Sequence, residues 1–119
     1  MLFSNIYVTL MIEIREFIRK DDSSPFARWF DSLDAQAAAK VTTYLTRIEN
    51  GNTSSLKSLG SGVHECRVNW GPGYRVYLGQ DGKELVILLG GGTKKRQQND
   101  IDAAKRLWKE YKERKKKEK

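Results

Sequence analysis

The chain has 119 residues, 39% of them hydrophobic and 31% charged, and this length and composition suit one globular domain with a single core. Its one cysteine excludes an internal disulfide, and one cysteine with one histidine cannot build a structural zinc site. The formal net charge of +7 favours a polyanionic partner, most often nucleic acid.

The first ten residues are apolar, but they carry neither a basic leading segment nor a small-residue cleavage site. They are also too short to span a bilayer, so we expect an N-terminal extension over residues 1–10, no membrane partner and a cytoplasmic location. Residues 12–18 then alternate between apolar and polar side chains, which predicts a half-buried first strand.

Two short helices are predicted next. Ser24 can cap the first, Pro25 suits its first turn, and residues 26–33 carry apolar side chains at helical spacing. Asp34 can cap the second helix, which its alanines favour and which Gly51 ends. The two helices therefore form a predicted helical hairpin.

Three strands are predicted after a polar linker over residues 52–62. Their ranges are 63–70, 73–79 and 84–90. Between the last two strands, Asp81-Gly82 is the signal of a two-residue hairpin turn.

The last predicted helix spans residues 97–114, with Asn99 or Asp100 as its cap. The element order β-α-α-β-β-β-α predicts an α+β fold in which the helices pack on one face of a small, mainly antiparallel sheet. Residues 112–119 have the composition of a frayed, solvated segment, and removing their six cations and two acids lowers the net charge to +3. We therefore assign 11–113 to the folded domain and 114–119 to a basic C-terminal tail.

Charged side chains share one face of the predicted strand pair. Side chains of equal parity lie on the same face, and a tight turn at residues 70–72 places Arg67 opposite Arg75 and Glu65 opposite Tyr77. Two facing arginines are unfavourable unless the diagonal Glu65 holds them or a phosphate lies between them. Two interpretations stay open: an exposed ion-pair network, or a cationic surface that binds phosphate.

A glycine-rich segment, GGGTKKRQQ at residues 90–98, follows the third of these strands and precedes a helix start. Glycines let a backbone approach a ligand closely, and the free N–H groups of a helix start suit an anion. Neither of the nucleotide-binding patterns GxxxxGK[ST] and GxGxxG occurs, so no nucleotide cofactor is expected. The segment predicts either an anion-binding loop or a plain turn.

This part of the chain resembles the addiction-module killer proteins, the phage-derived, RelE/HigB-like branch of the RelE/ParE toxin superfamily. The family pattern is G-V-x-E-x-R-x-x-x-G-P-G-Y-R-V-Y, followed by L-L-x-G-G-x-K-x-x-Q-x-x-D-I-x-x-A. The chain meets it at Gly62, Val63, Glu65, Arg67, Gly71, Pro72, Gly73, Tyr74, Arg75, Val76, Tyr77, Gly91, Gly92, Lys94, Gln97, Asp100, Ile101 and Ala104. Residues 11–62 also fit the opening strand and helical hairpin of the family. Family members often carry an acid beside the lysine, where this chain has Thr93, so no acid is assigned there.

The resemblance implies the toxin of a type II toxin–antitoxin system, an endoribonuclease that cleaves messenger RNA on the ribosome. Its implied partners are the ribosome, the mRNA and a cognate antitoxin with a DNA-binding helix-turn-helix domain. We expect neither a cofactor nor a metal. Carried onto the matching positions, the resemblance makes Arg75 the phosphate clamp, Arg67 its partner and Lys94 a second cation. Tyr77 would stack on a base or assist proton transfer, and Glu65 would act as a base or hold the two arginines.

Three neighbours of Lys94 are expected to contact RNA: Lys95, Arg96 and Gln97. The general base stays open, because His64 has the opposite parity to the arginines and is expected to be buried, and Asp100 is either a base or a helix cap. Three other functions stay open as well. They are a ParE-like toxin that inhibits DNA gyrase, a non-catalytic nucleic-acid-binding module, and a phage remnant without activity.

Overall fold

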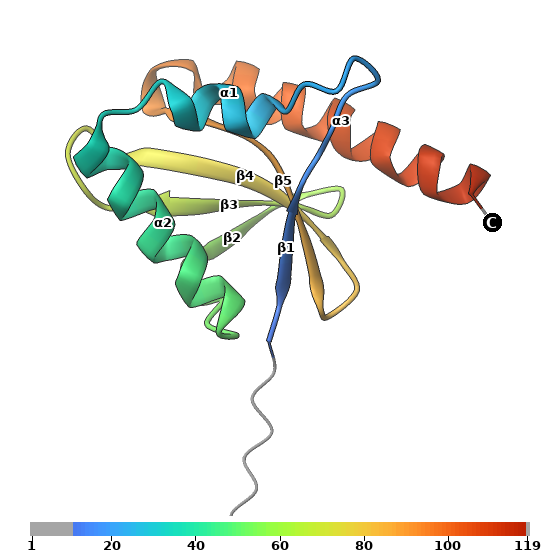
Figure 1. Cartoon of the computed structure of the whole chain (residues 1–119), viewed down its shortest axis with the longest axis horizontal. Helices are drawn as coiled ribbons and strands as arrows, with labels where there is room; N and C mark the ends of the chain where they lie inside the picture. Colours follow the sequence, from blue (N-terminus) through green and yellow to red (C-terminus); the bar gives the residue numbers. More distant parts are fainter. Residues whose placement is uncertain (1–10, 119) are drawn as a thin grey trace, which may run out of the picture.

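The computed structural model describes residues 11–118, and within that range five strands form one mixed sheet with three helices packed on it (Figure 1). The predicted extension at residues 1–10 lies outside the described residues. The strands are β1 (Glu13–Glu16), β2 (Leu56–Gly60), β3 (Val63–Val68), β4 (Tyr74–Asp81) and β5 (Leu85–Thr93). Their spatial order is β1-β5-β4-β3-β2, with β1 parallel to β5 and all other neighbours antiparallel.

Strand β2 lies in the segment that the sequence predicts to be a polar linker. Lys57 pairs with Glu65 of β3. Leu56 and Leu59 are partly buried against the two core clusters, and the other residues of the strand are exposed. Only two of the five residues of this edge strand are apolar, and they do not alternate with period two, which is why the hydrophobic pattern did not reveal the strand.

Helices α1 (Pro25–Asp31) and α2 (Ala35–Glu49) form the predicted hairpin. Ser24 Oγ accepts a hydrogen bond of 3.0 Å from the backbone N–H of the third helical residue. Asp34 Oδ1 accepts one of 2.8 Å at the start of α2, and Gly51, with a φ of 88°, follows its C-terminal cap. Both predicted caps and the predicted glycine stop are therefore confirmed.

Helices cover both faces of the sheet, so the prediction that they pack on one face is wrong. One face packs against α1 and α2, through Ile12, Phe26, Val41, Ile48, Cys66, Val68, Val76, Leu78, Val86 and Leu88. The opposite face packs against α3 (Gln97–Lys117), through Phe17, Val63, Tyr77, Ile87, Leu89, Ala104, Leu107 and Trp108. The reason lies in β5, whose residues 86–89 are all apolar, because a strand that is apolar on both faces must be covered on both.

The glycine run at residues 90–92 belongs to β5 and is not a loop. Residue Leu89 is an extra residue in the pairing with β4, and beyond this bulge Gly90 faces Tyr77. Trp29 of α1 lies so close to Gly91 that an added Cβ would collide with its ring. Gly79 on β4 receives the ring of Trp108 from α3 in the same way. These glycines therefore let helices approach the sheet.

Helix α3 begins at Gln97 as predicted, but its N-terminal cap and its C-terminal end differ from the prediction. A 3₁₀ turn, η1 (Lys94–Arg96), leads directly into it, so Asp100 lies in the first turn and does not cap it. The helix continues through Lys117, so residues 112–117 are helical and not frayed. Its red C-terminal part extends past the strands in Figure 1.

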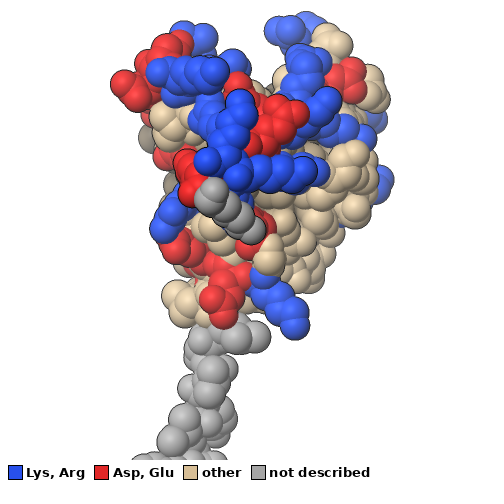
Figure 2. Space-filling model, turned by 90° about the vertical axis from the view of Figure 1, so that its right-hand side faces the viewer, with Lys and Arg blue, Asp and Glu red and all other residues tan. Residues whose placement is uncertain are grey.

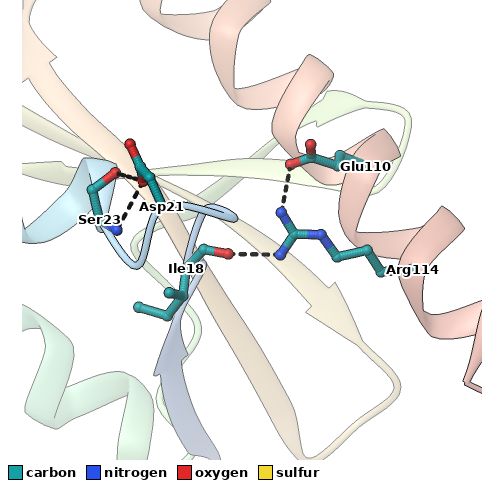
Figure 3. A network of polar contacts seen from close by, with 5 residues as sticks. All are labelled: Ile18, Asp21, Ser23, Glu110 and Arg114. Atoms are coloured by element: carbon teal, nitrogen blue, oxygen red, sulfur yellow. Dashed lines mark hydrogen bonds and ion pairs between the residues drawn. The ribbon is translucent and has the colours of Figure 1, made fainter.

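Contacts near the end of α3 explain why residues 112–117 are helical. The Arg114 guanidinium lies 4.7 Å from the centre of the Phe17 ring. It donates a hydrogen bond of 2.6 Å to the carbonyl of Ile18 (Figure 3). It also forms an ion pair of 3.1 Å with Glu110, one helical turn earlier. The end of the helix is thereby attached to the segment that follows β1.

The turn between β4 and β5 has three residues, 82–84, because Asp81 pairs with Leu85. The predicted two-residue turn is wrong by one residue. Gly82 still has the positive φ, 72°, that the sequence signal requires.

Candidate functional site

The strand register places the predicted site residues together. Arg67 pairs with Arg75 and Glu65 with Tyr77 across β3 and β4, which confirms the predicted register. These side chains lie on the sheet face that α3 covers, so the polar face is not the open surface that the sequence suggested.

Glu65 is the buried centre of this arrangement, with none of its surface exposed. Its Oε2 accepts a hydrogen bond of 3.2 Å from Arg67 Nε and lies 3.6 Å from Arg75 Nε. Its Oε1 accepts a hydrogen bond of 3.2 Å from the Gln97 side-chain amide at the start of α3. One carboxylate therefore joins β3, β4 and α3, and buried charges are stable only when they are paired in this way.

The two arginines differ in exposure. The side chain of Arg75 is 9% exposed, whereas that of Arg67 is 52% exposed. The expected exposed ion-pair network is thus wrong for Glu65 and Arg75, which lie inside the protein. Only Arg67 presents its charge openly to solvent, with Arg75 held behind it.

Tyr77 is fully buried, and its hydroxyl has no hydrogen-bond partner among the described residues. Burial raises its pKa to about 12, the carboxylates of Asp100 and Glu65 add to the shift, and Arg75 opposes it. The phenol is therefore neutral at pH 7. Because the ring is buried, it has no exposed face on which a base could stack.

Asp100 lies in the first turn of α3, and its carboxylate packs directly against Gly92 of β5. A Cβ at Gly92 would collide with Asp100 Oδ2. Burial raises the pKa of this carboxyl, and Arg96 opposes the shift. A raised carboxyl pKa brings an acid closer to the range in which it can exchange protons with a substrate.

A small cavity of about 140 Å³ adjoins this acid. Tyr77, Asp100 and Arg19 contribute its polar side chains, and the rest of the lining comes from α3, from β5 and from Pro25. The cavity brings the phenol and the carboxyl to one place. The sequence named Asp100 as a base or a helix cap, but it could not show that the carboxylate packs against Gly92 of β5, because that contact joins two elements.

The cations beside the end of β5 are exposed. Lys94, Lys95 and Arg96 all lie on η1, and none of them forms an ion pair with another described residue. Gln97 is half-buried instead, and its amide is engaged by Glu65. The three cations thus lie between the strand that carries Gly92 and the helix that carries Asp100.

His64 and Cys66 share the parity opposite to that of the arginines. His64 is half-buried and not buried as expected, and its Nδ1 has no hydrogen-bond partner among the described residues. Cys66 belongs to the core on the α1 and α2 face, and burial raises the pKa of its thiol. Over residues 11–118, no three His, Cys, Asp or Glu side chains are placed so that they could hold a metal ion. In the same part of the chain, no helix has the length and apolar composition needed to cross a membrane.

Charges at the far end of the molecule are arranged differently. Figure 2 shows that side, where Lys and Arg side chains lie among Asp and Glu. Lys115 Nζ lies 2.5 Å from Asp81 Oδ2, and the Tyr111 hydroxyl donates a hydrogen bond of 2.6 Å to the same oxygen. A groove of about 410 Å³ lies here between β1 and α3, lined by side chains of both signs.

Comparisons with known proteins place this chain in a family. The family model described as phage-derived protein Gp49-like (DUF891) matches residues 28–109. An uncharacterized protein of Haemophilus influenzae is 42% identical over 83 residues, which cover 69% of this chain and 84% of that protein. The chain therefore belongs to the Gp49-like family of phage-derived proteins, which confirms the phage-derived part of the predicted resemblance.

Proposed function

We propose that this chain is the toxin of a type II toxin–antitoxin system and that it cleaves messenger RNA on the ribosome. One observation carries the proposal: in a Gp49-like chain, buried Glu65 fixes two arginines beside a neutral phenol and a carboxyl of raised pKa. Such a cluster has the parts that RNA cleavage by transesterification needs.

In this reaction the 2′-oxygen of a ribose attacks the adjacent phosphorus. A P–O2′ bond forms and the P–O5′ bond breaks, which leaves a 2′,3′-cyclic phosphate and a 5′-hydroxyl end. One proton leaves the 2′-hydroxyl and another reaches the departing 5′-oxygen. The protein must therefore orient the strand, stabilise extra negative charge at the phosphate and exchange two protons.

The cations supply the electrostatic part of the proposal. Arg67 and Lys94 are exposed and can meet the phosphate from β3 and from η1. Glu65 holds Arg75 in a fixed position behind Arg67, so its charge needs no rearrangement during the reaction. Glu65 itself is fully buried, so we assign it to positioning and not to proton transfer.

The Asp100 carboxylate is the general base that we propose to take the proton of the 2′-hydroxyl and, once protonated, to donate a proton to the departing 5′-oxygen. Its pKa is raised by burial, and it lies beside the exposed cations of η1. Tyr77, neutral because its pKa is about 12, adds no negative charge beside Asp100. The ribosome would supply what the site lacks, which is a groove that holds single-stranded mRNA in register.

The proposed antitoxin acts on the same charges. An acidic segment placed over Arg67 and the η1 cations would neutralise them and block the mRNA, because charge complementarity is the direct way to cover an open cationic surface. In keeping with the resemblance, we expect this antitoxin to carry a DNA-binding helix-turn-helix domain.

Incubation of the purified protein with a reporter mRNA tests the proposal, with and without translating ribosomes. We expect new 5′ ends within codons only when ribosomes translate the message. The Arg67→Ala variant should yield none. Cleavage of free RNA at the same rate as translated RNA would refute the dependence on the ribosome. Absence of cleavage, together with inhibition of DNA supercoiling by gyrase, would refute the proposal in favour of a gyrase-inhibiting toxin.

A further inference from the structure

A second group of cations lies away from the buried cluster, between the β2–β3 turn and the middle of α3. A groove of about 450 Å³ at this place is lined by Ser61, Lys105, Arg106, Lys109 and Lys112. Four of the five lining residues are cationic and none is acidic. A hollow of one sign concentrates the electric field, which a flat mixed surface does not.

The spacing of three of these lysines sets their geometry. Lys105, Lys109 and Lys112 are separated by four and three residues, so they lie on the same side of α3. With a rise of about 1.5 Å per residue, they form a row about 10 Å long parallel to the helix axis. Trp108 points from the same helix into the core, which fixes the rotation of the row.

The turn opposite the helix forms the other wall. Gly60, Ser61 and Gly62 all have positive φ, at 87°, 58° and 84°. A side chain at Gly60 would come within 3.9 Å of Lys105 Nζ. Ser61 therefore adopts a backbone conformation that is uncommon for a non-glycine residue, and the turn carries no bulky side chain at the rim.

These cations are unpaired. None of the four forms an ion pair or a side-chain hydrogen bond with another described residue, whereas Arg114 and Lys115 farther along α3 pair with Glu110 and Asp81. Four like charges around one hollow repel each other and cost stability, and an anion in the groove would remove that cost.

We propose that this groove binds the phosphate backbone of base-paired RNA. None of the lining residues is aromatic, and single-strand sites typically use aromatic side chains on which bases stack. A straight row of lysines suits the regular phosphates of a duplex, which it contacts without reading the bases. The choice of RNA over DNA rests on the proposed function, since a ribosome presents base-paired RNA.

The proposed RNA-binding groove and the candidate cleavage site lie on the same helix, α3. The first turn of α3 carries Gln97 and Asp100, and the groove begins at Lys105 on the same rigid element. A structured RNA held by the middle of α3 would therefore fix the position of the candidate cleavage site relative to that RNA.

Fluorescence anisotropy with a labelled RNA hairpin of about two helical turns tests the proposal, since its stem offers the full row of phosphates. The test variant is Lys105→Gln with Lys109→Gln, and the control is Lys20→Gln with Lys40→Gln, two exposed lysines that lie elsewhere and carry the same total charge. We expect binding of the test variant to weaken roughly tenfold or more, and the slope of log affinity against log salt to fall by about two. The control should keep the wild-type affinity and slope.

Equal weakening in test and control variants would overturn the proposal, and so would unchanged binding of the test variant. Tighter binding of an unpaired strand than of the hairpin would overturn the assignment to base-paired RNA, and tighter binding of duplex DNA would overturn the choice of RNA. If circular dichroism shows that the variant Lys105→Gln with Lys109→Gln is unfolded, the variant Arg106→Gln with Lys112→Gln takes its place. It removes the same charge at two exposed positions. Because binding is measured without cleavage, the result is independent of whether the protein is a nuclease.

Discussion

Glu65 carries its carboxylate into the interior of the protein, and the groups around its two oxygens decide what each neighbouring residue can do. Arg67 and Gln97 donate hydrogen bonds to it, and Arg75 lies 3.6 Å away. A buried acid that loses one of its partners keeps its desolvation cost. Substitutions in this cluster therefore affect stability and function to different degrees.

Arg75→Ala should lower both stability and activity. The substitution leaves the buried Glu65 carboxylate without the Arg75 charge beside it. We expect a loss of up to about 3 kcal/mol in the free energy of unfolding. Arg67→Ala removes a half-exposed cation and should cost less stability than Arg75→Ala while abolishing toxicity. Urea denaturation and a growth assay measure both. If Arg75→Ala left stability unchanged, the Glu65 ion pair would have no structural role.

Substitution of Asp100 gives a prediction in which the size of the stability effect depends on pH. Its pKa is raised above 3.8 in the folded protein, so the stability that the protonated acid contributes is present below pH 3.8 and is lost as the pH rises through the folded-state value. Asp100→Asn imitates the protonated acid. We therefore expect it to raise the melting temperature at pH 7 and to have little effect at pH 3.

The same substitution should remove RNA cleavage, because an amide cannot accept the proton. An Asn variant that is less stable than wild type at pH 7 would mean that the charged carboxylate is favoured where it lies. Scanning calorimetry at the two pH values makes the comparison.

At the scale of the elements, α3 positions the site. Its first turn supplies Gln97 and Asp100, its middle packs Trp108 on Gly79, and its end is attached through Arg114. The helix is therefore held at its start, in its middle and near its end. Small changes in how it docks should alter the site.

Gly79→Ala tests the docking of this helix. The added methyl group collides with the Trp108 ring, and overpacking of this kind costs about 1–3 kcal/mol. Combining it with Trp108→Leu should make the cost of the methyl group much smaller, which a double-mutant cycle would show. Additive effects in the cycle would mean that the two residues do not contact each other as described.

The C-terminal part of α3 offers a second test. Deleting residues 113–119 removes the Arg114 contacts with the Phe17 ring and the Ile18 carbonyl, and we expect a loss of about 1–3 kcal/mol in the free energy of unfolding. Deleting residues 117–119 should have no measurable effect. Equal stability of the two truncated proteins would show that the segment is the solvated tail that its composition suggests.

For the whole molecule, local signals predicted the elements better than their arrangement. The caps at Ser24 and Asp34 and the facing pair Arg67 and Arg75 follow from neighbours in sequence, and all are confirmed. The second face of the sheet was missed, although the apolar run at residues 86–89 requires it.

The candidate site was predicted only in part for the same reason. Parity placed Glu65 with the arginines, but their burial depends on α3, which joins them from the other end of the chain. The match between Gly92 and Asp100 is likewise a contact between two elements. A run of glycines in one sequence predicts backbone freedom, and only the packed helices reveal that they make room for side chains.

Ribosome-dependent cleavage is the central claim for the whole molecule, and mapping of 5′-hydroxyl ends in cells tests it most directly. After a short pulse of expression, RNA from cells with the wild-type chain should carry new 5′-hydroxyl ends inside coding regions, in a fixed phase with the reading frame. Cells with the Arg67→Ala chain should lack them. Growth arrest by the wild-type chain without such ends, or ends that are spread equally over untranslated RNA, would contradict the account.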